Sequence, residues 1–198
     1  PMVFLDFEAY SLAIPPFDGV RPYEKVPFQF SLHTVGRKGA KPKHYEFLAD
    51  PDKDPREEVA RRLLAELPGD VCIVVYNKTF EQGVLRSLKM WFPIHAARFE
   101  GMLANIRDLK DPFSKKQVYH WKMNGSASIK RVLPVLVPGK SYKGMQVSSG
   151  LEAPIAYFSM AEAKDATKRA KIRKSLLAYC KLDTLAMVKI LDKLRGMA

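Results

Sequence analysis

Four carboxylates stand at positions where the surrounding pattern favours apolar side chains. In the segment Met2–Glu8, the alternation of a β-strand places Phe4, Asp6 and Glu8 on one face and apolar residues on the other. Two acids therefore project side by side from a strand that otherwise has the composition of a core strand. Such a pair also occurs at the solvated end of an ordinary strand, so its meaning depends on the remaining acids.

Glu81 follows a continuous apolar run that ends at Tyr76, the composition of a strand buried on both faces. With Leu85 and Leu88 it falls on one stripe of a predicted helix, which places it near the inward edge. An acid in the first turn of a helix also stabilises the helix dipole, and for Glu81 taken alone this structural role is the simpler interpretation.

Asp183 is the acid that is hardest to explain as structure. Tyr179 lies four residues earlier on the same side of the last predicted helix, and the nearby lysines point to other faces. A carboxylate inside an apolar stripe costs several kcal/mol unless it is paired or bound to a metal ion, so the alternative is a distant arginine partner. The stripe consists of Leu176, Cys180, Asp183, Met187, Ile190 and Leu194.

The four acids predict a metal site if the fold brings them together. Carboxylates packed without partners would repel one another and take up protons, whereas divalent cations relieve that repulsion. Oxygen ligands without a cysteine or histidine pattern favour Mg²⁺ or Mn²⁺. Two such ions about 3.5–4 Å apart are typical of enzymes that cleave phosphodiester bonds.

The charge distribution points to a polyanionic partner. The chain of 198 residues carries a net charge of +12; residues 1–99 contribute 14 basic and 13 acidic side chains, and residues 100–198 contribute 19 and 8. This one-sided basic field favours nucleic acid over a membrane surface. No apolar run approaches the ~20 residues of a membrane span, and two cysteines build no disulfide framework. We therefore expect a soluble cytoplasmic domain without a membrane partner.

The order of elements predicts a single α/β domain over residues 1–198, with a mixed sheet flanked by helices. Alternation and apolar runs predict strands over 2–8, 26–35, 44–48 and 71–76. Helical spacing predicts a helix that begins at Asp54-Pro55 and ends at Pro68-Gly69, and further helices over 80–88, after Ser128 and over 169–194. Residues 111–125 and 138–160, rich in Pro, Gly and Ser, are expected to be irregular.

Three segments resemble, in order, the motifs of the DEDD exonuclease superfamily, which includes the proofreading domains of DNA polymerases and ribonuclease D. They are Phe4-Leu-Asp-Phe-Glu8, Asn77-x-x-Phe80-Glu81 and Tyr179-x-x-x-Asp183. The last spacing is similar to that of the tyrosine subgroup. The resemblance covers almost the whole chain and implies a ribonuclease H-like fold, with an antiparallel meander followed by parallel strands.

The chain also resembles, more closely, an uncharacterised bacterial family of nuclease-like domains found at the C-terminus of longer proteins. The resemblance is carried by Ile14-Pro-Pro-Phe-Asp-Gly19, Pro27-Phe-Gln-Phe-Ser31 and Tyr179-Cys-x-Leu-Asp-Thr-Leu-Ala-Met187. Together with the start of the sequence directly on a strand, it leads us to expect a domain excised from a longer protein, whose other domains would be partners.

The resemblance assigns a role to each motif residue. Asp6, Glu8 and Asp183 would hold one ion, with Asp6 bridging to a second that Glu81 holds through water. Tyr179 would orient the attacking water. The second motif usually ends in Asp, and the extra methylene of Glu81 displaces its carboxylate by up to about 1.5 Å, which is either accommodated or weakens the second metal. Asp108 is either a further helper or, more simply, a helix-cap or turn acid.

Several other residues are candidates for binding the substrate, each with an ordinary surface or packing role as its alternative. Asn77 either holds the strand-to-helix turn or contacts substrate. The candidate phosphate contacts are Lys115, Lys116, Lys122, Lys130 and Arg131, and on the last helix Lys168, Arg169, Lys171, Arg173 and Lys174. Base stacking is open to Tyr119, His120 and Trp121, and His120 is disfavoured as a catalytic base.

The sequence thus predicts a 3′–5′ exonuclease that acts on the 3′ end of single-stranded DNA or RNA by a two-metal mechanism. The main alternative is a nucleic-acid-binding module of the same fold with impaired catalysis, which the Glu81 departure favours. An endonuclease or integrase-like enzyme usually has fewer motif acids and lacks Tyr-x-x-x-Asp. A protein-interaction domain with structural acids would bind no metal.

Overall fold

A five-stranded mixed sheet forms the centre of the structure, a computed structural model that describes residues 1–37, 39–67 and 70–197. The strands lie in the order β3-β2-β1-β4-β5. β1, β2 and β3 are antiparallel neighbours, whereas β4 runs parallel to β1 and β5 parallel to β4. Their bounds are β1 Met2–Tyr10, β2 Val26–Val35, β3 Lys43–Leu48, β4 Cys72–Val75 and β5 Ile106–Asp108.

The pleat of β1 divides the interior into two cores. Val3, Leu5 and Phe7 pack on one side of the sheet, and Phe4 and Tyr10 pack on the other. β1 is the central strand of a sheet covered on both faces, so Val3, Phe4, Leu5, Phe7 and Tyr10 are almost fully buried. The side of Phe4 and Tyr10 is also the side from which Asp6 and Glu8 project.

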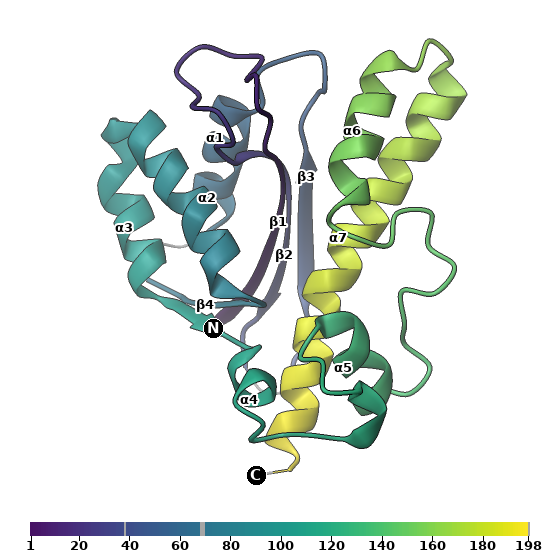
Figure 1. Ribbon diagram of the computed structural model, residues 1–198. Coiled ribbons are helices and arrows are strands. Elements are labelled where there is room, and N and C mark those ends of the chain that lie inside the picture. The colour runs from purple at the N-terminus through teal and green to yellow at the C-terminus, as the bar shows by residue number, and fades with distance from the viewer. Residues whose placement is uncertain (38, 68–69, 198) are drawn as a thin grey trace.

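Helices cover both faces of the sheet (Figure 1). α1 and α2 pack on the Val3 side, with η1 and α3 beside α2; α5, α6 and the long α7 form the layer on the other side. In the described parts of the chain, no helix is both long and apolar enough to cross a bilayer. The helix bounds are α1 Arg56–Glu66, α2 Lys78–Trp91, η1 Pro93–His95, α3 Ala96–Ala104, α4 Asp111–Ser114, η2 Trp121–Met123, α5 Ile129–Leu136, α6 Glu152–Glu162 and α7 Ala166–Arg195.

This arrangement confirms the predicted fold class. Three antiparallel strands followed by parallel strands, with helices on both faces, are the layout of ribonuclease H-like domains. The strand bounds of β2 agree with the prediction, and β1 extends two residues beyond Glu8. α1 ends at Glu66; the stop predicted at Pro68-Gly69 lies outside the described residues.

The expectation of irregular structure over 138–160 is wrong for its second half. α6 begins at Glu152 and packs against α7, with Ala153, Tyr157 and Met160 buried at helical spacing. Pro154 lies in the first turn of α6, where proline is compatible with a helix, so it was a misleading signal of a loop. The short elements α4 and η2 likewise interrupt the stretch 111–125, and neither α3 nor β5 was predicted.

Candidate functional site

Three acidic side chains from opposite ends of the chain meet on the α7 side of the sheet. Asp6 and Glu8 project from β1 and Asp183 from α7, and one carboxylate oxygen of each lies within 4.8 Å of the others. Glu8 and Asp183 are only 5% and 7% exposed. α7 packs on both β1 and β2, so the middle of this helix passes over the face from which the two strand acids project. The structure therefore brings together three of the four acids singled out by the sequence.

Glu81 lies in the same cavity as these acids, outside their closest group. The cavity has a volume of about 500 Å³, and all four carboxylates line it together with Tyr179. Glu81 is buried, and its Oε2 atom has no hydrogen-bond partner among the described residues. Because an unpaired buried carboxylate oxygen is costly, this atom indicates a missing cationic or hydrogen-bonding partner.

The turn before α2 fixes the position of Glu81. Asn77 adopts the left-handed conformation with φ of 83°, and the backbone N–H groups of Asn77 and Lys78 each donate to the carboxylate of Asp108, over 2.9 Å. The turn role of Asn77 is thus present, although this residue also lines the cavity. Asp108 holds the turn and is not among the residues that line the cavity, so its interpretation as a turn acid is confirmed.

The four carboxylates disfavour ionisation of one another. Burial raises the pKa values of Asp6 and Glu8 well above their ordinary range, and the negative charge of Asp183 raises both further. Burial raises the pKa of Asp183 to about 6 and that of Glu81 to about 8. Without cations, the cluster therefore retains protons near neutral pH.

This donor set fits hard divalent cations. All four groups offer carboxylate oxygens, which Mg²⁺ and Mn²⁺ prefer, and a cation would relieve both the burial of their charge and the repulsion among Asp6, Glu8 and Asp183. The unpaired Glu81 Oε2 is a further oxygen in the same cavity that could serve as a ligand. The nearby thiol of Cys180 is a poor competitor, since burial and the charge of Asp6 raise its pKa.

Two tyrosines and a lysine surround Asp183. The hydroxyl of Tyr142 donates to Asp183 Oδ1 over 2.6 Å, and the ring of Tyr142 meets that of Tyr179 edge-on at 6.1 Å. Lys130 Nζ lies 5.7 Å and 5.3 Å from these two ring centroids. Burial, followed by the charge of Asp183, raises both tyrosine pKa values, so both side chains remain neutral phenols. Sequence reasoning missed Tyr142, which lies in a Gly- and Ser-rich loop without periodicity.

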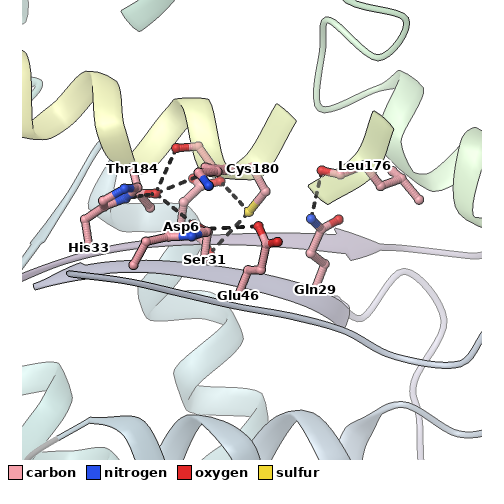
Figure 2. Close-up of polar contacts among 10 residues, drawn as sticks. Asp6, Gln29, Ser31, His33, Glu46, Leu176, Cys180 and Thr184 are labelled. Carbon is pink, nitrogen blue, oxygen red and sulfur yellow. Dashed lines mark hydrogen bonds and ion pairs between the residues drawn. The ribbon is translucent and has the colours of Figure 1, made fainter. Parts of the chain in front are cut away.

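A buried polar network fastens α7 to β2 beside the acids (Figure 2). Thr184 Oγ1 contacts Ser31 Oγ at 2.8 Å and His33 Nδ1 at 2.7 Å. Two residues before Ser31 on β2, Gln29 Nε2 donates to the backbone oxygen of Leu176 over 2.8 Å. Because Thr184 follows Asp183 directly, the network sets the position of this carboxylate relative to β1. Asp6 is held in turn by a contact of 3.4 Å from Cys180 Sγ to Oδ2.

The amino-acid sequence matches a described protein family. Residues 3–128 match the family described as Domain of unknown function (DUF2779). The chain belongs to this family. The matched segment of the DUF2779 domain contains Asp6, Glu8 and Glu81, whereas Tyr179 and Asp183 lie beyond it. No curated protein matches the chain.

The structure separates the predicted phosphate contacts of the DUF2779 domain into groups. Lys130 lines the cavity, whereas Lys115, Lys116, Lys122 and Arg131 are exposed outside it. On α7, Arg169 pairs with Asp50 and Asp52, and Arg173 donates to the backbone oxygen of Leu48, so both have structural partners. Lys168, Lys171 and Lys174 are exposed.

Proposed function

We propose that this DUF2779 domain is a metal-dependent 3′–5′ exonuclease that hydrolyses phosphodiester bonds of single-stranded DNA or RNA. The convergence of Asp6, Glu8 and Asp183, with Glu81 unpaired in the same cavity, carries the proposal. The basic half of the chain supports a polyanionic substrate. The direction of degradation follows from the resemblance of the three motifs, and a cytoplasmic location remains part of the proposal.

The motif resemblance assigns a role to each acid that lines the cavity. Asp6, Glu8 and Asp183 would hold one ion, and Glu81, through water, and Asp6 would hold a second. When bound, such ions lower the pKa of an attacking water and neutralise the charge on the leaving oxygen. The protein contributes a rigid arrangement of ligands on β1, α2 and α7, which keeps the reacting groups aligned.

Tyr142, Tyr179 and Lys130 complete the site. Tyr179 remains protonated, so it orients the attacking water by hydrogen bonding and does not act as a base. Tyr142 donates to Asp183 Oδ1 and so helps to fix the orientation of this carboxylate. Lys130 presents an ammonium group on the wall of the cavity, where it attracts the phosphate of the terminal nucleotide.

The test is degradation of 5′-labelled and 3′-labelled single strands of DNA and RNA, with Mn²⁺ or with EDTA. We expect early loss of the 3′ label and a shortening ladder from the 5′ label, both only with Mn²⁺. Asp183→Asn should reduce the rate by about a hundredfold or more, because it removes a ligand of the first ion. Asp192→Asn is the matched control, since Asp192 is exposed on the same helix.

The other outcomes separate the alternatives. Cleavage of a circular single strand would replace the exonuclease by an endonuclease. Binding of the strands with or without metal, and without any cleavage, would indicate the catalytically impaired binding module. Equal cleavage by the parent protein and Asp183→Asn would contradict the proposed site.

A further inference from the structure

One wall of the cavity is built from a stretch of the chain without any acid. Residues 112–151 contain no aspartate or glutamate and seven basic residues: Lys115, Lys116, Lys122, Lys130, Arg131, Lys140 and Lys143. Ile129, Lys130 and Ser149–Leu151 from this stretch line the cavity together with the carboxylates. The stretch thus places one cation, Lys130, on the cavity and exposes its other basic residues on the surface of the molecule.

Two large aromatic side chains are exposed within this stretch. Tyr119 is 57% and Trp121 is 70% exposed, although most aromatic residues of the domain lie in its cores. The ring of His120 stacks on Trp121, with 5.8 Å between centroids and 23° between planes. Lys122 Nζ lies 5.5 Å from the centroid of the Trp121 ring. Trp121 thus presents an open aromatic surface next to positive charge.

The surrounding structure holds this aromatic pair in place. His120 Nδ1 accepts a hydrogen bond from the backbone N–H of Lys122, which fixes the imidazole against the indole. Met123, the last residue of η2, is 1% exposed in the core that η2 shares with α5. Further along, the hydroxyl of Tyr76 on the cavity wall donates to the backbone oxygen of Ala127 over 2.7 Å. The exposed rings are therefore fixed relative to the cavity.

We propose that residues 119–122 form a stacking platform for unpaired bases of the single-stranded nucleic acid whose end enters the carboxylate cavity. Trp121 and Tyr119 stack on bases, and Lys115, Lys116 and Lys122 contact the phosphates of the same strand. The choice of polymer rests on the proposed function. Stacking on aromatic rings beside a positively charged track is a general way to hold single strands without reading their sequence.

The charge of the platform favours nucleic acid over a protein partner. Lysine is depleted at the centre of protein interfaces, whereas here Lys122 lies beside the Trp121 ring, Lys115 and Lys116 precede Tyr119 closely in the sequence, and residues 112–151 contain no acid. Lys115 is already paired with Asp111, over 2.9 Å, but Lys116 and Lys122 have no ion-pair partner among the described residues. A flexible polyanion with exposed base faces matches both features of the surface.

The experiment measures binding without cleavage, in EDTA, with an oligothymidylate of about 16 nucleotides. The protein has two tryptophans, and the Nε1 atom of Trp91 donates to the backbone oxygen of Gly19 under the guanidinium of Arg56. In Trp91→Phe protein, the emission of Trp121 should be quenched on titration with the single strand, and a hairpin duplex of equal charge should quench it little.

Substitutions then test whether the ring contributes to affinity, measured by anisotropy of a labelled strand. We expect Trp121→Ala to weaken binding about five- to a hundredfold and Trp121→Phe to retain most of it. Ile94→Ala, at an 89% exposed side chain outside the basic stretch, should bind like the parent protein. Combined alanine substitution of Lys116 and Lys122 should reduce the slope of log K against log salt by about 1.4.

Two results together would overturn the platform: unquenched Trp121 emission in Trp91→Phe protein and unchanged affinity of Trp121→Ala protein. The exposed face would then be assigned to a protein partner. This failure differs from failure of the proposed function. Metal-dependent cleavage with an inert Trp121 leaves the exonuclease standing and removes the platform. Quenching and Trp121-dependent binding, without cleavage by the parent protein, would support the platform and remove the exonuclease.

Discussion

Stability and proposed function conflict most directly at Glu81. The metal-free fold favours its protonated form, whereas the proposed metal binding needs the ionised carboxylate. Burial raises its pKa to about 8 in the folded protein, from 4.5 as the ordinary value. Between these two pH values, the folded protein keeps a proton that the unfolded chain has released. The free energy of unfolding therefore falls as the pH rises, by at most ~1.4 kcal/mol per pH unit for this group.

Replacement of Glu81 by glutamine should remove this contribution. We expect metal-free Glu81→Gln protein to lose less stability than the parent between pH 5 and pH 8, in urea unfolding followed by circular dichroism in EDTA. Glu66→Gln, at an exposed glutamate that ends α1, should follow the parent protein. Identical pH slopes for Glu81→Gln and the parent would show that Glu81 is not the buried acid that takes up the proton.

Single residues of the site were predictable where each broke a local pattern. Asp6, Glu8 and Asp183 occupy apolar positions of a strand or a helix stripe, so periodicity singles them out, and the strand pair gains its meaning from the acids elsewhere in the chain. Tyr142 has no such signal, because its role depends on a loop that returns to α7 forty-one residues before Asp183 along the chain. Cys180 was predicted in the stripe of α7, but its contact with Asp6 requires the packing of two distant elements.

At the scale of elements, the polar contacts of Thr184 with Ser31 and His33 form a seam between α7 and β2. This seam decides where Asp183 lies. Thr184→Val keeps the shape of the side chain and removes the hydroxyl that contacts Ser31 and His33. The buried imidazole then has no partner from α7, which should lower the free energy of unfolding by about 1–3 kcal/mol. Because the seam positions Asp183, we also expect the affinity for Mn²⁺ to fall several-fold.

Two measurements distinguish a role of Thr184 in positioning Asp183 from a role in stability alone. Urea unfolding gives the stability loss, and calorimetric titration with Mn²⁺ under native conditions gives the affinity. Thr167→Val is the control on the same helix, since Thr167 is exposed in the first turn of α7. A Thr184→Val protein that is less stable but binds Mn²⁺ as tightly as the parent would reduce the seam to a purely structural role.

Elements with a clear period were predictable, and elements defined by their neighbours were not. β2 alternates and α7 carries a long apolar stripe, so both were predicted almost to their ends. β5 has three residues and becomes a strand only by pairing with β4. α6 begins just after Ser149-Gly150 and contains Pro154, and its helical form depends on packing against α7.

The whole molecule brings its two ends together at the site. β1 lies at the centre of the sheet and begins at Met2, whereas α7 ends at Arg195, and the acids of both share one cavity with Glu81 from the middle of the chain. In the metal-free protein their mutual repulsion opposes this arrangement. Any cation that these residues share would connect three segments that the unfolded chain keeps far apart.

Divalent ions should therefore stabilise the folded molecule as a whole. At a Mn²⁺ concentration of about 100 Kd, binding to the folded state alone adds ~2.7 kcal/mol. For a domain of this size, that corresponds to a rise in Tm of about 5–10 °C at pH 8, measured by differential scanning calorimetry. The rise should shrink at pH 5, where protons already occupy the carboxylates, because metal and protons compete for the same oxygens. Asp183→Asn should lose most of the increment and Asp192→Asn should keep it; equal increments in both variants would mean that Mn²⁺ binds elsewhere on the molecule.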